Sequence, residues 1–146
     1  MVSIIAILAA IVVPAFSNHR EEAAIAATAS DLTSMAQAVM HYHASTETYP
    51  SDVVSRVTPP ELADLLPPNI FRKPVPITGV YDYNYGTNGG ITLCAITIYD
   101  PTPDLDQWQA LDELIDDGDL STGQLMRTAT SGYFSQNLNY VIRVNP

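Results

Sequence analysis

Basic residues are scarce in this chain. Only six of its 146 residues are Lys or Arg, against 16 Asp and Glu, and the formal net charge is −10 at pH 7. Such a molecule repels phosphate backbones, whereas nucleic-acid binding depends on Lys and Arg side chains that neutralise phosphates. We therefore expect no nucleic-acid partner.

Cysteine and the common catalytic motifs are also sparse. Cys94 is the single cysteine, so the chain cannot form an internal disulfide. A glycine-rich phosphate loop, a paired-cysteine metal motif and a Gly-x-Ser-x-Gly turn are all absent from the sequence. On a helix, the rings of His41 and His43 would point about 200° apart, which does not suit a shared metal ion. These absences predict that the protein is not an enzyme. None of its motifs identifies a cofactor.

The first 18 residues, MVSIIAILAAIVVPAFSN, carry no charge. As a helix they would span about 27 Å, slightly less than a bilayer core. Its large apolar residues lie all round that helix: Ile4, Ile5, Ile7, Leu8, Ile11, Val12 and Val13. A cleaved signal peptide would have basic residues before the apolar run, and so short a chain builds too little core to surround such a helix. We therefore favour a membrane anchor, which Pro14 should kink or open locally at residues 11–13.

The amphipathic pattern that follows predicts that the helix does not stop at the apolar segment. Its apolar positions recur at spacings of three, four and seven: Ile25, Leu32, Met35, Ala36, Val39 and His43. A single helix is expected from about residue 2 to residue 44. We divide the chain into residues 1–45, a long helix with an apolar part (1–18) and an amphipathic part (19–45), and residues 46–146, a globular head.

The string SIIAILAAIVVPAFSNHREEA resembles the first helix of type IV pilins and of the pseudopilins of type II secretion. Thr48-Tyr49-Pro50, just after this helix, is similar to a tyrosine-proline found at that place in many pseudopilins. Family members begin with a basic leader ending in glycine, then a methylated phenylalanine and a nearby glutamate, none of which is present here. Alignment on Pro14 implies that roughly eight mature residues precede Met1, which restores a span of ~20 residues.

The resemblance implies an α+β fold of the type IV pilin kind, a long amino-terminal helix with a small antiparallel sheet packed on its carboxy-terminal half. It implies a structural subunit of a pseudopilus that serves type II protein secretion, anchored in the bacterial inner membrane with its head in the periplasm, or assembled in an extracytoplasmic filament. Its expected partners are copies of itself, other pseudopilins, the inner-membrane assembly platform and the prepilin peptidase that processes the precursor. A type IV pilus pilin and a membrane-tethered binding module that does not polymerise are the alternatives. The single cysteine favours a pseudopilin over a pilin, because many type IV pilins close their carboxy-terminal region with a disulfide.

The head should contain two short helices. Thr58, two prolines and Glu61 form a capping pattern that predicts a helix over residues 59–66, ended by Pro67. Thr102 and Pro103 should open another helix that closes near Gly118. The apolar positions of this second helix are Leu105, Trp108, Leu111, Leu114 and Ile115.

Three strands are expected as well. Residues 80–85 and 91–99 are rich in aromatic and β-branched types and flank a turn at residues 86–90, which predicts an antiparallel hairpin. Residues 140–144 read as a further strand. Tyr81, Tyr83 and Tyr85 share one face at a period of two, which is typical of sheet packing.

Half of the acidic residues gather between residues 100 and 119, where there is no Lys or Arg. Asp116, Asp117 and Asp119 would lie at the negative end of a helix dipole, at a cost of about 0.3 to 1 kcal/mol each. A Ca²⁺ ion bound by these three carboxylates around Gly118 would compensate the charge. The alternative is a solvated acidic face. An EF-hand is excluded because Ile115 falls where that loop needs an acidic ligand.

Overall fold

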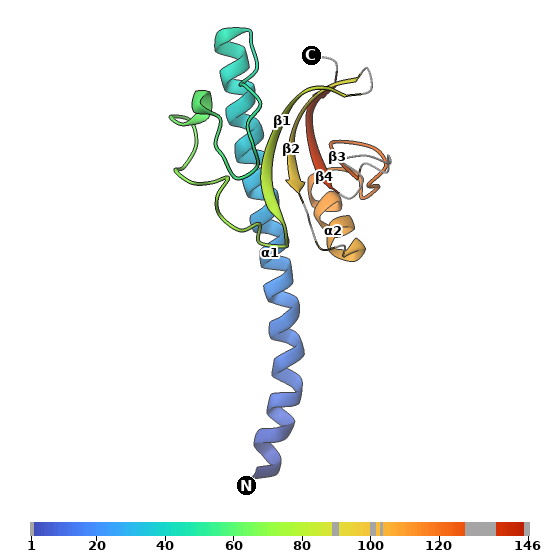
Figure 1. Cartoon of the computed structure of the whole chain (residues 1–146). Coiled ribbons are helices and arrows are strands. Elements are labelled where there is room, and N and C mark those ends of the chain that lie inside the picture. Colours follow the sequence, from blue (N-terminus) through green and yellow to red (C-terminus); the bar gives the residue numbers. More distant parts are fainter. Residues whose placement is uncertain (1, 89–90, 100–101, 103, 128–136, 145–146) are drawn as a thin grey trace.

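A long helix and a four-stranded antiparallel sheet form the framework of the protein (Figure 1). The structure is a computed structural model that describes residues 2–88, 91–99, 102, 104–127 and 137–144, with side chains described from residue 18 onward except at 87, 88, 91, 92, 143 and 144. The elements follow the order α1, η1, β1, β2, α2, β3, β4, and the strands lie in the order β1-β2-β4-β3. The expected α+β fold is confirmed.

Helix α1 runs from Val2 to Thr46, and the sheet packs against its carboxy-terminal half (Figure 1). The predicted apolar stripe is buried there, with Leu32, Met35 and Val39 fully inaccessible to solvent. Helix α1 is continuous across Pro14, so the predicted opening at residues 11–13 is not found in this single chain. A proline removes only one amide donor, and the hydrogen bonds of the turns before and after it can hold the helix together.

Strands β1 (Val80–Asn88) and β2 (Ile91–Tyr99) pair along their whole length. Strand β1 extends to Asn88, three residues into the turn predicted at 86–90, because Asn88 pairs with Ile91 and only residues 89–90 connect the two strands. The tyrosine stripe is confirmed as packing, since Tyr81 and Tyr83 are fully buried opposite Ile98 and Ile96. This face of the sheet, together with α1, forms the core.

Strand β4 (Leu138–Val144) lies between β2 and β3 (Leu125–Arg127). The sequence did not predict β3, because three residues are too few to show a period. A register shift at Cys94 and Ala95 marks a bulge between β2 and β4.

Helix α2 (Leu105–Ile115) is shorter than expected. Asp104, not Thr102, is its N-cap, and the Asp104 carboxylate accepts a hydrogen bond from the backbone amide of Gln107 at 3.2 Å. Trp108 and Leu111 are buried as expected, but Leu105 and Leu114, in the first and last turns of α2, are half exposed.

The expected helix over residues 59–66 is only a single 3₁₀ turn, η1 (Pro60–Leu62), followed by turns. Thr58 does not cap it. The Glu61 carboxylate, expected to complete the capping box, instead accepts hydrogen bonds from the Ser51 amide at 3.1 Å and the Ser51 hydroxyl at 2.7 Å. These hydrogen bonds lower the pKa of Glu61 and connect the chain after α1 to η1.

Candidate functional site

The amino-terminal half of α1 projects from the head, and no described element lies beside it (Figure 1). The residues predicted for membrane insertion and self-assembly lie here: Ile4, Ile5, Ile7, Leu8, Ile11, Val12, Val13 and Pro14. Their backbone is helical, and their side chains lie outside the described residues. Among the described side chains, Asn18 to Ala23 are exposed and Ile25 is the first buried one. The head therefore begins to cover α1 only at about Ile25.

Across the part of the chain whose side chains are described, which starts at Asn18, no helix has the length and apolar character needed to cross a membrane.

One carboxylate on α1 ties the helix to both the loop and the sheet. Asp31 accepts a hydrogen bond from the Tyr81 hydroxyl at 2.8 Å and forms an ion pair with the Lys73 amine at 2.6 Å. Burial, and then the nearby Asp31 carboxylate, raise the pKa of Tyr81, so its hydroxyl remains a donor. The contact fixes α1 against β1 and against the loop that precedes β1.

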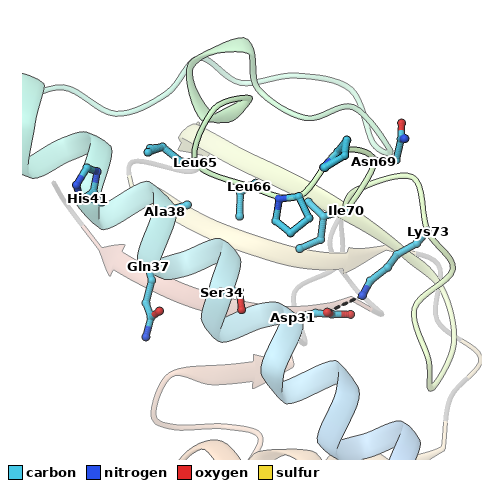
Figure 2. Close-up of a pocket in the computed structure, with 12 residues that line it drawn as sticks. Asp31, Ser34, Gln37, Ala38, His41, Leu65, Leu66, Asn69, Ile70 and Lys73 are labelled. Carbon is cyan, nitrogen blue, oxygen red and sulfur yellow. Dashed lines mark hydrogen bonds and ion pairs between the residues drawn. The ribbon is translucent and has the colours of Figure 1, made fainter.

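A groove of about 690 Å³ lies between α1 and the loop after η1 (Figure 2). Ser34, Gln37 and His41 line it from the helix, and Leu65 and Ile70 line it from the loop. The Asp31–Lys73 ion pair lies at one end (Figure 2). The groove is open, and the Ser34 hydroxyl that lines it donates a hydrogen bond to the Ser30 carbonyl at 2.7 Å.

The residues after α1 hold the end of the helix on the sheet. Tyr49 stacks between His43, at 4.1 Å between ring centroids, and Tyr85, at 5.2 Å. The carbonyl of Pro50 accepts a hydrogen bond from the buried Tyr83 hydroxyl at 3.3 Å. The tyrosine-proline of the resemblance thus lies at the junction between helix and head, and His43 is a packing residue.

Cys94 is buried in the core, with its Sγ atom 3.6 Å from the Tyr83 hydroxyl. Burial raises the pKa of the Cys94 thiol to about 11. A thiol in this state is neutral at pH 7 and is a poor nucleophile.

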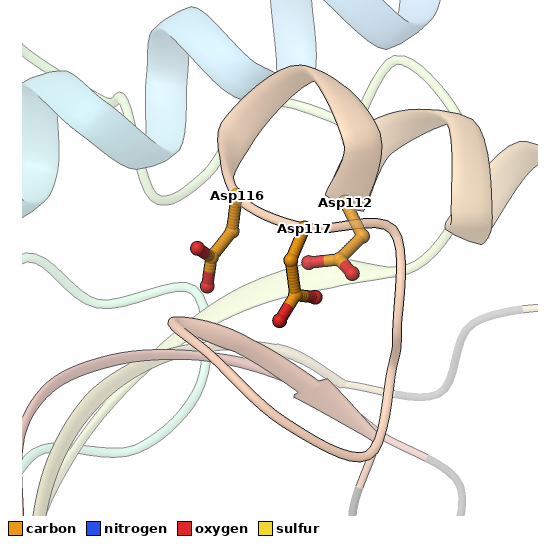
Figure 3. Close-up of side chains that lie close together, drawn as sticks. All are labelled: Asp112, Asp116 and Asp117. Atoms are coloured by element: carbon orange, nitrogen blue, oxygen red, sulfur yellow. The ribbon is translucent and has the colours of Figure 1, made fainter.

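Three carboxylates come together where α2 ends (Figure 3). One oxygen from each of Asp112, Asp116 and Asp117 lies within 4.8 Å of the others, and we call this group the aspartate cluster. Asp112 is fully buried, and burial together with the charges of Asp117 and Asp116 raises its pKa to about 6, against the smaller opposite effect of the Gly118 amide. Asp119, expected in a metal site, is not in the cluster, and its carboxylate instead accepts hydrogen bonds from the Ser121 amide and hydroxyl, which lower its pKa.

Sequence reasoning did not include Asp112 in the candidate site. The signal was present, because Asp112 lies four residues after Trp108 and next to Leu111, on the buried side of α2. An acidic residue at a position where the helical period predicts a large apolar one is expected to be buried. Because burying a carboxylate is costly, such a residue is a candidate for a functional site.

No protein-family model matches this sequence, and no curated protein does. The structure is similar to that of the major type IV pilin PilA1 from Clostridium difficile. The TM-score is 0.61, the match covers 86% of this chain and 98% of that chain, and the sequences are 18% identical. The chain therefore has a type IV pilin-like fold.

Proposed function

We propose that this protein is a structural subunit of a pilin-like filament and that it catalyses no reaction. The observation that carries the proposal is the amino-terminal half of α1, which projects from the head with no described element of the same chain beside it (Figure 1). The first 18 residues of the chain are uncharged and mostly apolar, so this half of α1 needs an environment that excludes water. The pilin-like fold supports the same role.

The apolar segment suits both lipid and a filament core. Either environment removes its apolar surface from water, so a subunit that leaves the membrane for the filament need not hydrate that surface. Attraction between the helices then comes from close packing, as between helices in a bilayer. The segment thus serves as an anchor before assembly and as the central packing element afterwards.

Among pilin-like filaments, we assign the protein to a pseudopilus that serves type II secretion. The absence of a second cysteine and the position of Tyr49-Pro50 at the junction of helix and head support this choice. The subunit would lie in the bacterial inner membrane with its head in the periplasm, after prepilin peptidase has processed and methylated the precursor. It would then enter the filament through the inner-membrane assembly platform, alongside other pseudopilins.

Electron microscopy of cells that overproduce the full-length protein tests the assembly role. Ile7→Asp or Ile11→Asp places a charge in the apolar segment and should abolish filaments. The matched control is Gln109→Asp, which adds the same charge at an exposed position of α2 and should leave filaments intact. Membrane fractionation shows whether each variant still inserts. An intact protein that inserts but never assembles would contradict the proposal and favour a tethered binding module.

Deletion of the gene in its host separates the two filament classes. A pseudopilus subunit predicts that secreted proteins accumulate in the periplasm while surface fibres remain. A pilus pilin predicts the opposite result, the loss of surface fibres with secretion unchanged.

A further inference from the structure

The charges of the head are divided between two sides of α1. Residues 65–79, in the loop between η1 and β1, carry Arg72 and Lys73 and no Asp or Glu. Residues 100–119, which include α2, carry eight acidic residues and no Lys or Arg. This loop lies on one side of α1, and α2 lies on the other (Figure 1). One head therefore presents a cationic surface and an acidic surface on different sides.

The cationic side contains the open groove between α1 and the loop after η1. Leu65, which is 40% exposed, lines it, and the ion pair between Lys73 and Asp31 lies at one end (Figure 2). Asp31 neutralises the charge of Lys73. Arg72, the preceding residue, is exposed and belongs to neither of the two ion pairs found among the described residues, Lys73–Asp31 and His19–Glu22. The groove thus combines an apolar wall with a positive charge that is not neutralised.

The acidic side presents the outward face of α2. Trp108 and Leu111 bury the inner side of this helix in the core. Asp106 and Glu113 are both exposed, and because they are seven residues apart they lie on the same side of the helix. Leu114, next to Glu113, is 58% exposed. We call Asp106, Glu113 and Leu114 the α2 face, which combines carboxylates with an exposed aliphatic side chain.

Identical surfaces of two copies cannot pair favourably. Each chain has a formal net charge of −10, so heads that come within a Debye length, about 10 Å at 0.1 M salt, repel one another. Two α2 faces would oppose carboxylates, and two grooves would oppose their Arg72 side chains. Only the α2 face of one copy against the groove of another offsets these charges. Such a head-to-tail contact joins two different surfaces, and it builds an open filament when the rotation between copies does not close a ring.

We propose that the α2 face of one subunit docks in the groove of a neighbouring subunit, with Leu114 against Leu65 and Glu113 beside Arg72. An amphipathic helix that lays apolar residues into a groove is a recurring mode of recognition. The inference rests on the proposed filament role and specifies which surfaces of the heads meet. Packing of the apolar halves of α1 would hold the subunits together, and the charged contact between heads would fix their register.

Disulfide cross-linking between two single-cysteine variants of the full-length protein tests this contact. The native Cys94 is buried and does not compete. Filaments assembled in cells that produce both Leu65→Cys and Leu114→Cys should give a linked dimer under mild oxidation, because a disulfide requires Cβ atoms about 4 Å apart. Either variant alone should give none, since each position meets the other one and not itself. The matched control pairs Leu65→Cys with Val54→Cys, which is exposed but belongs to neither surface and should not link.

Charge reversal tests the polar part of the contact. Arg72→Glu and Glu113→Arg should each lower filament mass by about tenfold or more, because like charges would then face each other across the interface. The double variant should recover most of the loss. The matched control is Arg56→Glu, the same change at an exposed residue of the same loop that lines a different pocket, and it should assemble normally. Gln109→Asp preserves the sign of the α2 face and should assemble as well. Circular dichroism shows whether each variant is folded.

The outcomes separate this inference from the filament role. If filaments form but Leu65→Cys and Leu114→Cys do not link and both charge reversals assemble normally, the contact is wrong and the filament role stands. A dimer from Leu65→Cys alone would show that two grooves meet and would also overturn the contact. If the unmodified protein forms no filaments, the filament role fails and the inference fails with it.

Discussion

Replacing Asp31 by alanine should destabilise the head, because this carboxylate joins three parts of the fold. Asp31→Ala leaves the buried Tyr81 hydroxyl without an acceptor and breaks the ion pair with Lys73. A hydrogen bond to a charged group contributes about 1.5 to 3 kcal/mol. The ion pair adds at most about 1 kcal/mol, since the Lys73 side chain is 44% exposed.

The better helix propensity of alanine returns a few tenths of a kcal/mol. We therefore expect a net loss of about 2 to 3 kcal/mol in the free energy of unfolding. Urea denaturation of the full-length protein in detergent, followed by circular dichroism, measures this loss.

Two double-mutant cycles separate the partners of Asp31. The cycle with Tyr81→Phe should give a coupling energy of about 1 to 2 kcal/mol, and the cycle with Lys73→Met should give less than about 1 kcal/mol. The difference follows from burial, because Tyr81 is fully buried and Lys73 is not. A Lys73 coupling larger than that of Tyr81 would refute this reasoning.

Three further results are expected. Burial, and then the charge of Asp52, raise the pKa of Asp82 from 3.8 to about 6, so its stabilising contribution is complete below about pH 3.8 and is lost as the pH rises through 6. Asp82→Asn should therefore add up to about 3 kcal/mol at pH 8 and nearly nothing at pH 3.5, as measured by denaturation at both pH values. Leu32→Ala should cost about 2.7 to 5 kcal/mol in urea denaturation, because Leu32 is fully buried in the core. The Cys94 thiol should react with a thiol reagent at pH 8 only after unfolding, and a rapid reaction in the folded protein would contradict its burial.

The sequence allowed the long helix and the hairpin to be predicted because their patterns extend over many residues. Helix α1 repeats its apolar positions over several turns, and β1 and β2 have nine residues each, rich in aromatic and β-branched types. Strand β3 has only three residues, and its pairing with β4 depends on residues 11 or more positions away. No local pattern can show such an element.

The cap of α2 and the turn at η1 were predicted wrongly for a different reason. Thr102 and Asp104 are both good N-cap residues, and only the position of α2 against the core decides which one is used. The Glu61 carboxylate found a donor in Ser51, ten residues earlier, instead of the local amide that the capping pattern requires. Short polar side chains have many competing partners, so tertiary contacts select among them.

The aspartate cluster shows the same limit at the candidate site. Asp116 and Asp117 were identified because they lie at the end of a helix, which is a local property. The burial of Asp112 depends on how α2 packs, and the loss of Asp119 from the cluster depends on its hydrogen bonds to Ser121.

The continuity of α1 connects the assembly role to the stability of the head. The segment that would lie in the filament core and the stripe that packs on the sheet belong to one uninterrupted helix. The described part contains no glycine and no linker between Asn18 and Ile25, so little can bend where the helix leaves the head. Movement of the amino-terminal half would therefore carry the head with it. The force would pass to the head through the Asp31 contacts and the buried apolar stripe of α1. A subunit drawn from a membrane into a filament needs this rigid connection, whereas a tethered binding module would function equally well on a flexible one.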